Sequence, residues 1–183
     1  MVRAKKRKSS WIDIKKAIIN FEPSEIVSLV RDLYQLSEEN KIFLNARYAE
    51  DGVTFRRYKE IIHKCLYPDV RDRSIDFEFE RAEKAINDFA KATGDEERTT
   101  DLMIYFVECG NQFTLDYGDI DEVFYDTLIE MYEKAVGRVR KMLKNKQRPF
   151  RNRLERIMKS TDGIGWGYHD DLGDLYYGAF QQR

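Results

Sequence analysis

Proline, cysteine and histidine are scarce in this chain, whose 183 residues include three prolines, two cysteines and two histidines. So few prolines leave long stretches free to form helices, because proline breaks the interior of a helix. Zinc sites draw on clusters of histidine and cysteine, so the low count of both argues against a zinc hydrolase. Cys65 and Cys109 have no cysteine at the spacing of a redox motif. We therefore expect both to be reduced thiols in the core of a cytoplasmic protein.

Long hydrophobic runs are also missing. No apolar run approaches the ~18 residues that a membrane-spanning helix needs, and no apolar segment of a signal peptide follows the basic first residues. The phosphate-binding loop and the nucleophile elbow, typical of nucleotide-binding proteins and serine hydrolases, do not occur. These absences predict a cytoplasmic protein without a membrane partner, and they favour a protein that is not an enzyme.

The chain is rich in charged residues and in apolar residues at helical spacing. Charged residues make up 36% of the sequence, above the usual ~25%, which is typical of long helices with polar outer faces. Apolar residues recur at intervals of three and four, and no segment has the pattern of a strand or hairpin.

The sequence therefore predicts an all-α fold, with a basic flexible tail over residues 1–9 and a single compact domain over residues 10–183. That domain would contain eight or nine helices, whose pairs could stack as a short irregular α-solenoid. One of the helices is predicted to open at Pro149, where the missing N–H does little harm.

Residues 101–144 are predicted to be the centre of this domain. They have the pattern of two long helices joined at residues 117–119, and the first contains the longest apolar run of the chain, residues 102–107. A helix that is apolar all round must be covered on all sides, so we expect this one to be the central element. Asp119 is predicted to cap the second helix, with Glu122 closing a capping box.

The most unusual local sequence lies in residues 163–171, where three glycines alternate with other residues around Trp166. Glycine permits left-handed backbone and the close approach of another segment. In one interpretation this is a tight turn that inserts Trp166 into the core and lets Asp170 or Asp171 cap the last helix. In the other interpretation His169 and Asp170 belong to a cleft, and Trp166 contributes to binding.

An acidic corner precedes the second central helix. Carboxylates at a helix start complement its dipole by about 0.3–1 kcal/mol each, which explains Asp119 and Asp121 without a ligand. Glu108 differs, because it lies in an otherwise apolar helix and a buried carboxylate needs a partner. It could pair with an Arg or Lys of a neighbouring helix, or with His169. Alternatively, Glu108, Asp119 and Asp121 could hold Mg²⁺, Mn²⁺ or Ca²⁺, which prefer oxygen ligands. With His169, Asp170 and Glu108 itself as catalytic candidates, this would be a metal-dependent phosphoester hydrolase.

Charge is distributed unevenly, although the net charge is −1. Residues 95–134 contain twelve acidic and two basic residues, residues 136–159 contain ten basic residues and one acidic residue, and the first eight residues add five basic ones. The basic side chains of this run could simply keep two exposed helix faces in water, and those late in the second central helix would complement the dipole at its end. The run could also bind nucleic-acid phosphates together with the N-terminal arm, or dock on the acidic block of a second copy. The candidate binding residues in this run are Arg138, Lys141, Arg148 and Arg151.

Three stretches of the chain are distinctive when taken together in order, and the second of them runs from residue 84 to residue 125 through three recognisable segments. They are YQLSEENKIFLN (34–45), then KAINDF (84–89), DLMIYFVE (101–108) and YGDIDEVFY (117–125), and finally DGIGWGYHD (162–170). This set resembles an uncharacterised family of small bacterial helical proteins, domain of unknown function 6155. The resemblance covers nearly the whole chain beyond the basic tail. It implies a single helical unit of bacterial or mobile-element origin and supplies no activity.

These observations favour a cytoplasmic bacterial helical protein that acts as a protein–protein interaction or assembly module, with a protein partner or by self-association, and without a cofactor. The motivation is the lack of an assembled catalytic set together with the separated blocks of charge. The alternatives are the metal-dependent hydrolase and a nucleic-acid-associated protein that uses the basic face of residues 138–159.

Overall fold

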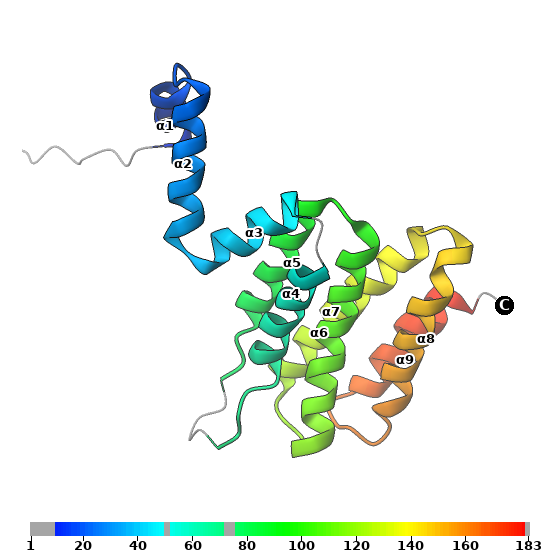
Figure 1. Ribbon diagram of the computed structural model, residues 1–183. Coiled ribbons are helices and arrows are strands. Elements are labelled where there is room, and N and C mark those ends of the chain that lie inside the picture. Colours follow the sequence, from blue (N-terminus) through cyan, green and yellow to red (C-terminus); the bar gives the residue numbers. More distant parts are fainter. Residues whose placement is uncertain (1–9, 50–51, 72–75, 182–183) are drawn as a thin grey trace, which may run out of the picture. The chain divides into compact units, whose positions relative to one another are not determined.

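The computed structural model describes residues 10–49, 52–71 and 76–181, and the predicted basic tail of residues 1–9 lies outside them. Within the described residues the chain forms nine α-helices and no strand, so the predicted all-α class is confirmed (Figure 1). The chain divides into two units, Met1–Leu44 and Asn45–Arg183. The predicted domain of residues 10–183 includes the second unit and the described part of the first.

The first unit contains α1 (Trp11–Ile18) and α2 (Pro23–Leu36), and α3 (Glu38–Tyr48) begins in it. The helices of the second unit are α4 (Gly52–Leu66), α5 (Phe79–Thr93), α6 (Glu96–Tyr117), α7 (Glu122–Lys141), α8 (Lys144–Ser160) and α9 (Tyr168–Phe180). They form three successive pairs, α4–α5, α6–α7 and α8–α9, which lie side by side with α6 and α7 in the middle (Figure 1). This arrangement agrees with the stacked helix pairs that the sequence analysis considered.

Helix α6 forms the core of the second unit. Its residues Leu102, Ile104, Phe106 and Phe113 have 0% solvent exposure. The helices that contact it are α4, α5, α7 and α8, so neighbours cover it on several sides. The longest apolar run of the chain therefore lies in the central element, as predicted.

The turn between α6 and α7 forms where it was predicted, but its capping residue differs. Gly118 follows α6 with a φ of 96°, a left-handed value that favours glycine. The N-cap of α7 is Asp121, whose Oδ1 accepts a hydrogen bond from the backbone N–H of Phe124 at 2.8 Å. The prediction that Asp119 caps this helix is therefore wrong. Because Asp119 lies before the cap, its carboxylate is free to bind side chains of other elements.

The prediction that a helix opens at Pro149 is also wrong, because α8 begins at Lys144 and contains Pro149 in its interior. Gln147, near the start of α8, donates from Nε2 to the carbonyl oxygen of Met142 at 2.9 Å, directly after α7. This bond closes a tight connection, so α8 starts almost at once after α7. Pro149 then lies in the second turn of α8, where it removes one intrahelical hydrogen bond.

The first unit has capped helices but no core. The backbone N–H of Ser10 donates to Oδ2 of Asp13 at 2.9 Å, and this hydrogen bond and that of the Ser10 hydroxyl lower the pKa of Asp13. A second capping box joins Glu22 and Glu25 at the start of α2. Nevertheless, no side chain of α1 or α2 is buried. At about 100° per residue, the apolar residues of α2 all fall within one half of the helix circumference. Helix α2 thus has a broad apolar face that the first unit leaves largely uncovered.

A close approach between α6 and α7 gives a test of the core. A Cβ atom at Gly110 would lie 2.5 Å from Cδ2 of Leu128, whose side chain is fully buried. We expect Gly110→Ala to lower the free energy of unfolding by about 1–3 kcal/mol, because the clash outweighs the better helix propensity of alanine. The control Gly137→Ala, in α7, places its Cβ in open space and should raise the free energy of unfolding by about 0.5–1 kcal/mol. Urea denaturation measures both, and equal effects would contradict the packing described here.

Candidate functional site

The carboxylate of Glu108 binds an arginine of the neighbouring helix α8. Nε and Nη2 of Arg153 each donate to one Glu108 oxygen at 2.7 Å, and Nη1 of the same guanidinium donates to Asp101. Lys59 of α4 forms an ion pair with Asp101 at 3.2 Å. Two carboxylates therefore face two cations, and the cluster links α4, α6 and α8. Of the partners considered for Glu108, the structure has the arginine of a neighbouring helix rather than His169.

Arg153 stays charged in this half-buried environment. Burial opposes its positive charge, but hydrogen bonds and attraction from Glu108, and then from Asp101, outweigh burial and raise the pKa of Arg153. The side chains of Arg153 and Asp101 are only 20% and 22% exposed, so water screens this pair less than it screens a surface pair. The cluster is therefore a structural tie between helices.

Trp166 does not enter the core, so the interpretation of its turn as a plug is wrong. The residue is 53% exposed, and its φ of 62° is left-handed, which is uncommon for a bulky residue. Its indole Nε1–H donates to Oδ2 of Asp119 at 3.1 Å. The hydroxyl of Tyr125 donates to Oδ1 of the same carboxylate at 2.6 Å. Asp119 therefore ties the glycine-rich turn to the start of α7.

Tyr125 carries this network into the core. Its hydroxyl lies 2.7 Å from Oγ1 of Thr114 in α6, and its ring centroid lies 4.9 Å from that of Tyr168 in α9. Burial, and then the hydrogen bond to Asp119, raise the pKa of Tyr125. The phenol therefore remains a hydrogen-bond donor at neutral pH, and the network joins α6, α7 and the turn before α9.

His169 is bonded to the end of α8. Its Nδ1 lies 3.0 Å from Oγ1 of Thr161 and 3.1 Å from the carbonyl oxygen of Met158. Asp170 is exposed in the first turn of α9, whose N-cap is Gly167 with a φ of 70° and no side-chain hydrogen bond. The prediction that Asp170 or its neighbour Asp171 caps this helix is therefore wrong. Both carboxylates still complement the helix dipole from the first turn.

The three candidate metal ligands have separate partners. Glu108 binds an arginine, Asp119 binds two aromatic side chains and Asp121 binds a backbone amide. Among the residues that the structure describes, no group of three His, Cys, Asp or Glu side chains is arranged to hold a metal ion. The structure thus does not gather the proposed catalytic and metal-binding residues into one site. These are Glu108, Asp119, Asp121, His169 and Asp170.

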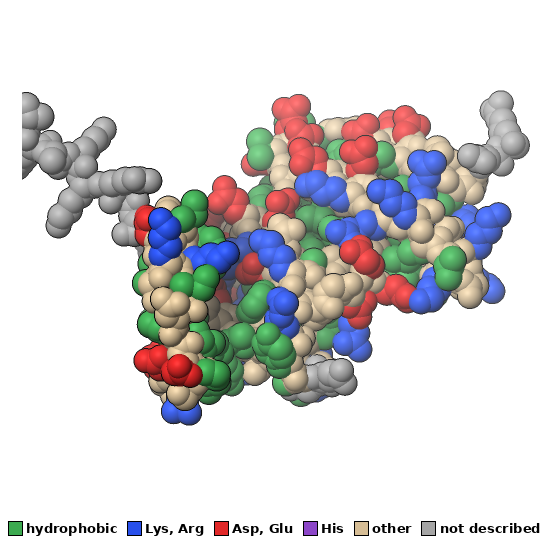
Figure 2. All heavy atoms as spheres, turned by 90° about the horizontal axis from the view of Figure 1, so that it is seen from above, with side chains coloured by type: hydrophobic (Ala, Val, Ile, Leu, Met, Phe, Trp, Pro, Cys, Tyr) green, Lys and Arg blue, Asp and Glu red, His purple; other side chains and the backbone are tan. Residues whose placement is uncertain are grey.

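The basic run and the acidic block face each other in part within the chain. Arg138 of α7 pairs with Glu96, and Lys146 of α8 pairs with Glu97, both at the start of α6. Arg153 pairs with two further carboxylates of α6, as described above. On the face that Figure 2 shows, basic and acidic side chains are interspersed. Three basic residues of the run therefore connect α7 and α8 to the acidic residues of α6.

The four candidate binding residues of the basic run have different surroundings. Arg138 is in the ion pair just described, and the guanidinium of Arg151 lies over the ring of Phe180, 4.8 Å from its centroid. Lys141 and Arg148 are exposed, and within the described ranges no ion pair is found for either. The structure therefore leaves two of the four as free surface cations.

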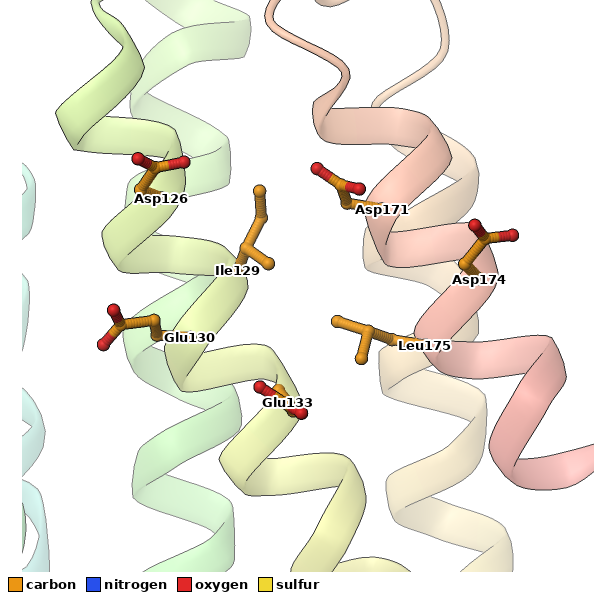
Figure 3. Close-up of a pocket in the computed structure, with 7 residues that line it drawn as sticks. All are labelled: Asp126, Ile129, Glu130, Glu133, Asp171, Asp174 and Leu175. Carbon is orange, nitrogen blue, oxygen red and sulfur yellow. The ribbon is translucent and has the colours of Figure 1, made fainter.

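A groove of about 520 Å³ between α7 and α9 is a feature that the sequence analysis missed. Ile129 and Leu175 point toward each other across it, and carboxylates surround them (Figure 3). One of these, Glu130, has an ion pair with Lys134 at 3.6 Å. The spacing of the acids on α7 was visible in the sequence, but their meeting with those of α9 depends on the tertiary fold. The carboxylates are Asp126, Glu130, Glu133, Asp171 and Asp174.

A second missed feature is an accumulation of exposed apolar side chains on α1, α2 and the residues between them. Their exposure runs from 36% for Tyr34 to 75% for Leu36. Scattered apolar residues are normal on a protein surface, but a contiguous set marks an interaction site. The helical period of these residues was recognised in the sequence, and what it could not reveal is that the helices of the first unit leave them uncovered. We refer to them as the α1–α2 apolar surface, consisting of Trp11, Ile12, Ile14, Ile19, Phe21, Val27, Val30, Leu33, Tyr34 and Leu36.

Comparisons of the chain with protein-family models, with curated proteins and with solved structures gave no match. The resemblance to the bacterial helical family therefore stays a prediction. None of the helices in the described residues combines the length and hydrophobicity needed to cross a bilayer.

The ion-pair cluster predicts unequal effects of two arginine substitutions in α8. Arg153→Met would leave two carboxylates in a half-buried site without their main partner, and we expect it to lower the free energy of unfolding by about 2–4 kcal/mol. The control is Arg156→Met, whose side chain is exposed and, among the described residues, bonds only the carbonyl oxygen of Asn152, at 3.3 Å. It should change stability by less than about 0.5 kcal/mol. Chemical denaturation compares the two, and the structural role of the cluster is refuted if they cost the same.

The bonds of Asp119 predict a loosened turn when its carboxylate is removed. Asp119→Ala takes an acceptor away from both Trp166 and Tyr125, and it should lower the free energy of unfolding by about 1–2 kcal/mol. In a Trp11→Phe background, the fluorescence of Trp166 should also change, because its indole N–H loses its partner. Asp126→Ala, on the exposed surface of α7, is the control and should alter neither signal. Unchanged Trp166 fluorescence in Asp119→Ala would show that the turn is held by other contacts.

Proposed function

We propose that this protein is a helical interaction module that binds another protein chain through the α1–α2 apolar surface. The observation that carries the proposal is the contrast between the two units. Neighbouring helices bury α6, whereas no side chain of α1 or α2 is buried. Keeping apolar surface in water is unfavourable by roughly 25 cal/mol per Å², so a partner that covers this surface gains free energy.

The charge arrangement supports this function over the alternatives. A nucleic-acid backbone attracts continuous positive surface, and ion pairs such as Arg138–Glu96 and Lys146–Glu97 neutralise part of the basic run. No observation favours the hydrolase, because its candidate ligands are bonded to separate partners. The proposal is therefore a non-enzymatic module, and it includes a cytoplasmic location and kinship with the bacterial family named above.

Photocrosslinking in the cells that produce the protein tests the proposal. Leu36 of α2 is 75% exposed, and Leu143, between α7 and α8, is 70% exposed. We expect p-benzoylphenylalanine at position 36 to give a crosslinked species of defined mass, because a partner lies against this surface. The same group at position 143 should give none. If positions 36, 33 and 27 all fail to crosslink, the α1–α2 apolar surface does not bind a protein and the proposal is wrong.

A further inference from the structure

We infer that the occupant of the α1–α2 apolar surface is a second copy of this chain, so that two copies form a two-fold dimer. This inference rests on the proposed function and names its partner. It is argued from the area of the surface, from the shape of α2 and from the charge of the segment.

The exposed apolar area is of the size that a dimer needs. Each partner of a standard interface contributes about 800 Å². The α1–α2 apolar surface has ten large side chains that are 36% to 75% exposed, and a fully covered aromatic side chain alone buries about 150–250 Å². The largest apolar patch on a typical monomer is only about 300–600 Å². Ten side chains with this exposure can therefore supply an apolar area of the order that one partner of a dimer contributes.

The shape of α2 suits another helix as its partner. Apolar residues cover one half of its circumference, and of these only Ile26 and Leu29 are half-buried. A helix buries such a face by packing against other helices. The α1 and α2 helices of two copies together would supply four helices around one apolar centre, which is the arrangement of a four-helix bundle. A second copy thus provides the core that one copy of the first unit lacks.

The charge of the segment does not oppose self-pairing. Residues 11–36 carry four acidic and three basic side chains, so two copies repel each other little. Away from the axis of a two-fold interface, a residue of one copy meets a different residue of the other, so that bases such as Lys15 and Arg31 can meet acids such as Asp32. Near-neutral charge also makes this segment a poor surface for nucleic acid, which requires an excess of cations.

Sedimentation equilibrium of the full chain over a series of concentrations tests the inference. We expect a reversible equilibrium between one and two chain masses. Val27→Asp and Leu36→Asp should each raise the dissociation constant at least about tenfold, because each would place a charge in an apolar contact. The matched controls are Val123→Asp and Leu143→Asp, which change the same residue types at 69% and 70% exposure in the second unit. They should leave the dissociation constant unchanged.

Alanine variants test the inference even if the substitutions to aspartate unfold α2. Val27→Ala and Leu36→Ala retain or improve helix propensity, so circular dichroism should show the same helix content. They should still raise the dissociation constant by about threefold or more, because they remove apolar contact area. A dimer that responds to none of these four substitutions uses another surface, and the inference is then wrong.

Single cysteines test the two-fold symmetry. The native thiols do not interfere, because Cys65 and Cys109 are buried and burial raises their pKa values to about 11 and about 12. A residue close to the two-fold axis lies near its own copy. Val30 and Leu33 lie at the centre of the apolar face of α2, so Val30→Cys or Leu33→Cys should form an inter-chain disulfide under mild oxidation. Val123→Cys is the control and should form none. Disulfide dimers from Val123→Cys in equal yield would mean random collision.

The outcomes separate this inference from the proposed function. A purified chain that is monomeric at every concentration overturns the inference. If position 36 then crosslinks in cells to a chain of another mass, the interaction function stands and only the second copy is wrong. If position 36 and its neighbours crosslink to nothing, both are wrong. Binding to phosphatidylglycerol vesicles that Leu36→Asp abolishes would likewise overturn the inference, because the surface would then bind lipid.

Discussion

Burial of helix α6 is the constraint on which the rest of the structure depends. Its side chains are apolar around most of its circumference, so it is stable only where other helices cover it. Helices α4 and α5 supply one cover, and α7 and α8 supply another. Helix α7 approaches α6 closely at Gly110, where the side chain of Leu128 fills the space that a Cβ would take. The three stacked pairs of the second unit follow from the need to enclose this helix.

The charged groups of α6 determine how its neighbours are attached. Glu108 and Asp101 interrupt the apolar surface, and a half-buried carboxylate needs a cation, which Arg153 provides from α8. The acidic start of α6 similarly pairs with Arg138 and Lys146. Part of the charge that is separated along the sequence is therefore paired in the fold. The apolar side chains of α1 and α2, in contrast, have no cover within the first unit, and this contrast supports the interaction function proposed above.

Features that depend on neighbouring residues could be predicted from the sequence, and those that depend on distant residues could not. The apolar run of α6 and the turn at Gly118 are local patterns, and both were predicted correctly. The role of Asp119 depends on Trp166, which comes from a distant turn, so local capping rules misplaced it. Pro149 was misread because the start of α8 is set by its tight connection to α7, which a local rule for proline cannot detect. The need of Glu108 for a partner was predictable from its apolar surroundings, but the identity of Arg153 required the tertiary fold.

The exposure of the α1–α2 apolar surface was hidden for another reason: helical spacing shows that a helix has an apolar face without showing what covers it.

The central claim is that the second unit is enclosed around α6 whereas the first unit has no core of its own. Native-state amide hydrogen exchange of the dilute protein measures this most directly, because it reports the stability of each helix separately. The account predicts that amides of residues 102–114 exchange most slowly, at the rate of global unfolding. Amides of α1 and α2 should exchange orders of magnitude faster, and they should become protected as the protein concentration rises. Protection of α1 and α2 equal to that of α6 in dilute protein, or opening of α6 before its neighbours, would contradict the account.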